Sequence, residues 1–73
     1  MDDNYNLLKK IRLSLSISQE ELARKLDISL RHYQNIEQEK SIPNIYTALK
    51  LCKILKIDPF ELWNIENNEI VKK

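Results

Sequence analysis

Residues 18–37, SQEELARKLDISLRHYQNIE, determine how this chain folds. Ser18 and Glu21 have the spacing of a capping box, in which each side chain bonds the backbone N–H of the other residue. A helix should therefore begin immediately after Ser18. Apolar residues follow on one face at helical spacing: Leu22, Ala23 and Leu26. The stretch thus predicts a short helix that ends near Asp27.

A second helix must follow almost at once. Ser29 is a typical N-cap residue, and Tyr33 and Ile36 form the next apolar stripe. Because only three residues separate the two helices, the chain has to turn sharply between them. Two short helices joined in this way are typical of the helix-turn-helix motif, here at about residues 19–38.

The rest of the chain is helical in pattern too. Periodicity predicts a first helix over about residues 4–15 and a fourth that begins after Asn44. The fourth helix is expected to turn these residues inward: Ile45, Ala48, Leu49, Cys52 and Leu55. Residues 58–61, DPFE, combine an N-cap, a proline and an acidic third residue, and predict a fifth helix. No segment has the pattern of a strand, so the expected fold is all-α, a compact bundle of five short helices.

Length and composition limit the function. Seventy-three residues, 42% of them hydrophobic, form one domain, which we place at residues 1–66 with a fraying tail at 67–73. The absence of glycine excludes Gly-rich phosphate loops, dinucleotide fingerprints and nucleophile elbows, so no enzyme is expected. One Cys and one His cannot form a zinc site or a disulfide, so no metal or cofactor is expected.

Charge and hydropathy point to a cytoplasmic protein. The longest uncharged stretch, residues 41–49, falls far short of the roughly 20 apolar residues that cross a membrane. No secretory signal precedes it, so Cys52 should be a reduced thiol. Residues 9–56 hold ten Lys or Arg and five acidic residues, a charge of +5. This suits a polyanion-binding face, although a solvated helical surface gives the same count.

From Leu8 to Trp63 the chain resembles the lambda-repressor-like helix-turn-helix family, also called the XRE type. The similar segments, in the same register, are residues 8–12 (LKKIR), 17–26 (ISQEELARKL), 33–37 (YQNIE), the basic loop from Lys40 to Pro43, and 49–55 (LKLCKIL). The resemblance implies a transcriptional regulator that binds double-stranded DNA, a repressor of bacterial, phage or mobile-element type. It further implies a homodimer on an inverted repeat, no small-molecule ligand, and a pairing of Arg12 with Glu37.

Within this resemblance, the exposed face of the third helix is the expected base-reading surface. Arg31 can bridge guanine O6 and N7, and Gln34 or Asn35 can bridge adenine N6 and N7. Leu30 suits contact with a thymine methyl group. The alternative is that Leu30 is merely a tolerated surface residue or packs on the turn.

Other residues are expected to contact the DNA backbone. Gln19 corresponds to a family residue that touches phosphate and can brace a side chain of the recognition helix. Further contacts are expected at helix N-termini and in the following loop, from Ser29, His32, Lys40, Ser41 and Asn44. His32 is alternatively a simply exposed residue.

A dimer surface is expected on the C-terminal helix. Phe60 and Leu62 should fill the core there, whereas Trp63 and Ile65 have no evident internal partner. Trp63 covering the small core is an open alternative. A second candidate patch lies at two positions that are usually polar in the family: Leu13 and Leu15.

A rival function is that of a protein-interaction module with the same fold, antitoxin-like or coactivator-like. Its contact residues would be the expected exposed apolar side chains, Leu13, Leu30 and Trp63. The modest net charge and Glu39 beside the presumed phosphate-facing loop favour this alternative slightly.

The absent glycines also predict unusual helix ends. Four positions at which family members often carry Gly are occupied by Ser16, Asp27, Glu39 and Lys56. Because a left-handed residue commonly closes the last turn of a helix, each should adopt positive φ with a side chain present or end the helix by another geometry.

Overall fold

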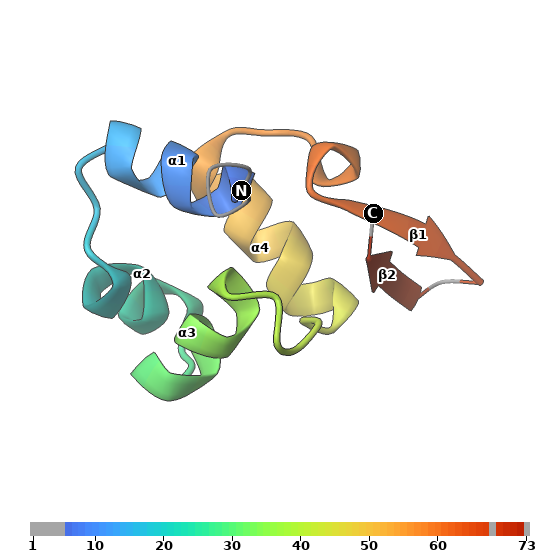
Figure 1. The fold of residues 1–73 in the computed structure, drawn as a ribbon, viewed down its shortest axis with the longest axis horizontal. Coiled ribbons are helices and arrows are strands. Elements are labelled where there is room, and N and C mark those ends of the chain that lie inside the picture. Colours follow the sequence, from blue (N-terminus) through green and yellow to red (C-terminus); the bar gives the residue numbers. More distant parts are fainter. Residues whose placement is uncertain (1–5, 68, 73) are drawn as a thin grey trace. The chain divides into compact units, whose positions relative to one another are not determined.

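The computed structural model describes residues 6–67 and 69–72 and forms two compact units, residues 1–41 and 42–73 (Figure 1). The first unit contains three helices: α1 (Leu7–Ser14), α2 (Gln19–Leu26) and α3 (Leu30–Glu37). The second unit contains α4 (Ile45–Leu55), the 3-10 helix η2 (Pro59–Glu61), and the strands β1 (Trp63–Glu66) and β2 (Glu69–Lys72). None of the helices in the described ranges is both long and apolar enough to cross a membrane.

Helices α2 and α3 begin at the capping residues that the sequence indicates, whereas α1 begins at Leu7 after the N-cap Asn6 rather than near residue 4. The hydroxyl of Ser18 accepts from the N–H of Glu21 at 3.0 Å, and that of Ser29 from the N–H of His32 at 2.9 Å. The buried apolar residues of this unit are Leu8, Leu22, Ala23, Leu26, Tyr33 and Ile36. Helices α2 and α3 pack against each other (Figure 1), and the small residue Ala23 of α2 is buried.

In the second unit, α4 begins at Asn44, whose Oδ1 accepts from the N–H of Thr47 at 2.8 Å. Its buried face consists of Thr47, Ala48, Leu51, Cys52 and Leu55. Ile45 and Leu49 lie off this stripe and are exposed, so the expectation that they face inward is wrong. Burial, aided by two nearby carboxylates, raises the pKa of the Cys52 thiol to about 11, so the thiol stays protonated at neutral pH.

The expectation of five helices and no strand is wrong at the C-terminal end. Asp58 does cap a helix there, because its Oδ1 accepts from the N–H of Phe60 at 2.9 Å. That helix, η2, lasts only three residues. The chain then enters β1, which pairs with β2 in antiparallel register, so the expected fraying tail is also wrong for residues 69–72.

Two local features explain why this segment forms a hairpin. Along β1 burial alternates, with Trp63 buried and its neighbour Asn64 exposed, and β-branched Ile65 lies opposite Ile70. Asn67 follows β1 with φ of 52°, a left-handed conformation that Asn adopts more readily than most residues. The alternating pattern of β1 is only four residues long. It directly follows residues 58–61 (DPFE), whose helix-start signal led to the prediction of a helix here.

Phe60 and Trp63 exchange the roles expected for them. Phe60 is 56% exposed, so it does not fill the core, whereas Trp63 is only 9% exposed and does. Ile65 is half-buried, and Leu62 is half-buried as well. The expected C-terminal helix is therefore absent from residues 62–67, and the burial of Trp63 agrees with the alternative in which this residue covers the core. A dimer contact at Trp63 and Ile65 stays a prediction.

All four expected helix ends adopt positive φ with a side chain present. The φ angles are 59° at Ser16, 61° at Asp27, 64° at Glu39 and 61° at Lys56. In this conformation the N–H of Asp27 bonds the Arg24 carbonyl at 3.1 Å, which closes α2. The chain thus keeps the helix-ending geometry and carries the steric cost of a Cβ at each position.

Lys56→Gly is expected to raise the free energy of unfolding by about 0.5–1 kcal/mol, because relief of the left-handed strain exceeds the added entropy of the unfolded chain. Urea denaturation followed by circular dichroism measures the change. Lys53→Gly is the matched control, since Lys53 is exposed inside α4. It should lower the stability by about 1 kcal/mol. A destabilising Lys56→Gly would contradict the assignment of strain to this residue.

Candidate nucleic-acid interface

An ion pair joins α1 to the end of α3. The Arg12 Nε lies 2.7 Å from Glu37 Oε1, and its Nη2 donates to Glu37 Oε2 at 3.2 Å. The residues are only 6% and 3% exposed, so this is a buried bidentate pair. The remaining Arg12 nitrogen, Nη1, donates to the carbonyl of Ile17 at 2.8 Å, which fastens the α1–α2 connection to the same guanidinium.

The carboxylate of Glu37 receives two more hydrogen bonds. The hydroxyl of Tyr33 donates to Oε1 at 2.7 Å, and the amide Nε2 of Gln19 donates to Oε2 at 2.8 Å. Together with Arg12, these groups supply four donors for the roughly four lone-pair sites that a carboxylate offers. Glu37 is therefore both buried and fully satisfied, which keeps its charge in place.

These contacts set the protonation states. Burial alone would raise the pKa of Glu37, but hydrogen bonds from Arg12, Tyr33 and Gln19 outweigh burial and hold it below its usual value. The hydrogen bond with Glu37 raises the pKa of Arg12 in spite of burial. Burial, followed by the same carboxylate, raises the pKa of Tyr33 far above its usual value. At neutral pH the cluster is a carboxylate, a guanidinium and a neutral phenol.

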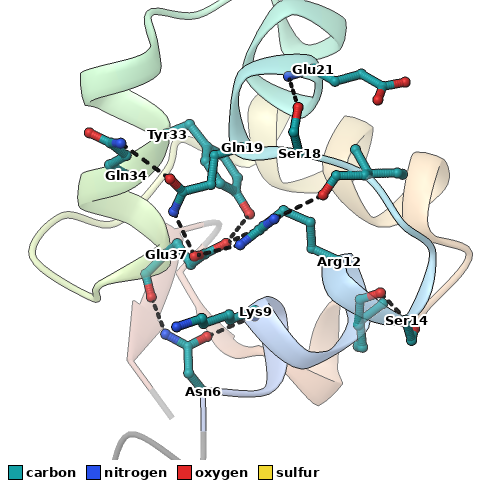
Figure 2. Close-up of polar contacts among 12 residues, drawn as sticks. Asn6, Lys9, Arg12, Ser14, Ser18, Gln19, Glu21, Tyr33, Gln34 and Glu37 are labelled. Carbon is teal, nitrogen blue, oxygen red and sulfur yellow. Dashed lines mark hydrogen bonds and ion pairs between the residues drawn. The ribbon is translucent and has the colours of Figure 1, made fainter.

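Gln19 connects this cluster to the middle of α3. Figure 2 shows its amide between Glu37 and Gln34: Nε2 donates to Glu37, and Oε1 accepts from Nε2 of Gln34 at 3.2 Å. Gln19 and Gln34 are both half-buried, from the first turn of α2 and the middle of α3. A continuous path of side-chain hydrogen bonds thus runs from Arg12 to Gln34.

Two members of the cluster were not predicted as site residues. Asn6 caps α1 and also donates through Nδ2 to the backbone carbonyl of Glu37. Tyr33 was predicted only as a core residue. A buried tyrosine usually needs a partner for its hydroxyl, and the four-residue spacing from Tyr33 to Glu37 places both on one helix face, so the sequence did contain this signal.

The first turn of α3 projects from this supported core. Ser29, Arg31 and His32 are exposed, and Leu30 is 40% exposed. The side chain of Leu30 also lines a shallow hollow of about 380 Å³ beside the turn, with Glu20, Ala23, Arg24, Asp27 and Ile28. Leu30 therefore presents apolar surface beside the turn, and its contact with a thymine methyl group stays a prediction.

The loop after α3 is held by the backbone of Asn35. Its carbonyl accepts from the N–H of Lys40 at 2.8 Å and of Ser41 at 3.2 Å, while its side chain is half-buried. Lys40 is exposed, and the buried hydroxyl of Ser41 has no partner among the described residues. Asn44 belongs to the second unit, where its side chain caps α4.

Comparison with known proteins gives one positive finding. A family model described as helix-turn-helix matches residues 8–62, from the second residue of α1 through η2. No curated protein matches the chain.

Proposed function

This chain belongs to the lambda-repressor-like, XRE-type helix-turn-helix family of DNA-binding transcription regulators, and on that premise we propose that it represses transcription by binding an inverted-repeat operator as a homodimer. We place the DNA-binding function within residues 1–66, with the motif at about 19–38. The third helix would enter the major groove, and repression would follow from steric exclusion of polymerase.

One observation carries the proposal: a buried, fully hydrogen-bonded cluster supports an exposed helix turn. The Arg12–Glu37 pair fixes the end of α3, and Gln19 fixes its middle. Exposed Arg31 and Leu30 then extend from a rigid base. A guanidinium and an apolar side chain held in this way can read guanine and a thymine methyl group. Rigid support matters because a mobile side chain would lose conformational entropy on binding.

The proposed homodimer follows from the size of one module. A single DNA-binding module buries only about 600–1,000 Å² of protein surface, so two copies are needed for useful specificity. Half-sites would lie about one helical turn apart, roughly 34–36 Å. Since Trp63 is buried, the more exposed candidate contact is the patch of Leu13 and Leu15, of which Leu13 is 57% exposed.

A second candidate function is a protein-interaction module. The same exposed leucines, Leu13 and Leu30, suit it, because their apolar surface could be buried against a partner protein. In this case the first turn of α3 would contact a protein, and affinity for DNA would be weak and independent of its sequence.

Selection from random duplexes at two salt concentrations separates these functions. We expect enrichment of a palindromic site, and a binding constant that falls steeply with salt because each phosphate contact releases counterions. The slope of log K against log salt should be about −0.9 for each phosphate neutralised. No enriched sequence, or affinity that does not change with salt, would favour the protein-interaction module.

A further inference from the structure

We infer that Glu37 sets, through Gln19, which atoms of the Gln34 amide face the DNA, so that Gln34 reads adenine and rejects guanine. The inference rests on the proposed function, because it assigns a base preference to the same surface. Glu37 and Gln19 act here as positioning residues, and Gln34 is the residue that touches the base.

The first step follows from the chemistry of a carboxylate. An ionised carboxylate can only accept hydrogen bonds. Glu37 remains ionised because Arg12 and Tyr33 bond it within a buried site. The Gln19 amide must therefore turn its Nε2 toward Glu37, as it does at 2.8 Å. An amide turned the other way would place two acceptor oxygens together in a half-buried position.

The second step passes this orientation to α3. With Nε2 of Gln19 on Glu37, its Oε1 faces Gln34, and only a donor can bond it. Gln34 therefore contributes Nε2, at 3.2 Å. This leaves Gln34 with its own Oε1 and one amide proton for an external partner. Both glutamines are half-buried, so the link restricts rotation of the Gln34 amide.

The third step compares the two free groups of Gln34, its Oε1 acceptor and its remaining amide proton, with the edges of the bases. Adenine presents an N6 donor and an N7 acceptor in the major groove, which match one acceptor and one donor. Guanine presents O6 and N7, which are both acceptors. The Oε1 of Gln34 would then face O6, and the amide cannot turn over without breaking its bond to Gln19. Adenine should be preferred over guanine by about tenfold or more, within the range of a good bidentate contact.

Gln19→Leu tests the relay, because it removes the middle link and leaves the Arg12–Glu37 pair in place. Competition binding with the selected operator, altered base by base, gives the ratio of affinities for adenine and guanine at each position. The position read by Gln34 is the one whose preference disappears in Gln34→Met. At this position we expect Gln19→Leu to reduce the ratio of adenine to guanine affinity from about tenfold to about twofold. Loss of a Gln19 phosphate contact would weaken both duplexes equally and leave the ratio unchanged. Gln38→Leu, at the exposed C-cap of α3, is the control and should keep the ratio.

Glu37→Gln tests the direction of the relay. The new amide can donate to Oε1 of Gln19, which would turn the Gln19 amide over and make it donate to Oε1 of Gln34. Gln34 would then offer two amide protons, the pattern that matches guanine. We expect the preference at the position read by Gln34 to shift toward guanine, so that the ratio of adenine to guanine affinity falls by about tenfold. Circular dichroism checks that Glu37→Gln is folded. If it is unfolded, the affinity ratio of Gln19→Leu decides whether the relay sets the base preference.

A measurement without DNA tests the relay independently. In NMR spectra of the free protein, the side-chain amide protons of Gln34 should shift and exchange faster in Gln19→Leu, but not in Gln38→Leu. Unchanged Gln34 signals, or an adenine-to-guanine ratio that survives Gln19→Leu, would overturn the inference alone. Failure to select any duplex with the wild-type protein would overturn the proposed function and the inference together.

Discussion

Arg12→Ala is expected to lower the free energy of unfolding by about 3–5 kcal/mol, because it leaves the buried carboxylate of Glu37 without its counter-charge. The substitution removes three hydrogen bonds at once, two to Glu37 and one to the Ile17 carbonyl. Since small domains are stable by only about 5–15 kcal/mol, this loss would remove a large share of the total stability. Urea denaturation of both proteins measures the difference.

Arg24→Ala is the matched control for this effect. Arg24 is exposed on α2, so its removal should change stability by less than about 0.5 kcal/mol. A loss below about 1 kcal/mol for Arg12→Ala would show that the pair contributes no more than a surface salt bridge. Alanine removes one partner only, and this distinguishes the test from joint replacement of both residues by apolar ones, which can be nearly neutral.

The same cluster should make stability depend on pH in acid. The folded pKa of Glu37 lies below its usual value of 4.5, so its contribution to stability is present above that pH. It is lost as the pH falls through the folded pKa, because protonation removes the charge that Arg12 and its neighbours bind. The acid limb of a plot of stability against pH should therefore become flatter in Arg12→Ala.

Arg31→Ala is expected to cost about 1–3 kcal/mol in operator binding, confined to one base position of each half-site. The guanidinium is exposed in the first turn of α3, where it can bridge guanine O6 and N7, and alanine cannot replace either bond. Titration of the variant against operators altered base by base measures the effect. At the position that Arg31 reads, the variant should no longer distinguish guanine from other bases.

Lys40→Ala is the comparison for this experiment. Exposed Lys40 lies in the loop after α3, where a lysine contacts phosphate without reading sequence. Its removal should weaken binding to all duplexes alike and reduce the salt slope by about one unit. An equal loss on operator and random DNA for Arg31→Ala would contradict its role as a base reader.

The helix-turn-helix and its helix ends could be predicted because their causes lie within a few residues. Ser18 and Ser29 cap helices through N–H groups three residues ahead. The positive φ at Glu39 and Lys56 follows from closing a helical turn where family members often have glycine. Such interactions depend on short spacing in the chain, so the order of residues determines them.

The C-terminal region could not be predicted in the same way, because its local signals conflict. Asp58 and Pro59 do start a helix, but cross-strand pairing of Ile65 with Ile70 outweighs its continuation. Strand pairing depends on a partner further along the chain, which propensity alone does not reveal. In the structure Trp63 of β1 is buried, whereas Phe60 of η2 is exposed.

The sequence by itself thus determined the motif, the caps, the left-handed helix ends and the identity of most candidate DNA-contacting residues. Only the tertiary structure decided how these residues are held. Glu37 lies 31, 25 and 18 positions from Asn6, Arg12 and Gln19, yet all four meet in one cluster. The donors of Arg12 and Gln19 must point at one carboxylate from separate helices, and Asn6 must reach the backbone carbonyl of the same residue. Helix packing rather than local spacing sets those directions. For this reason the orientation of the Gln34 amide, on which base preference is proposed to depend, could be read only from the folded chain.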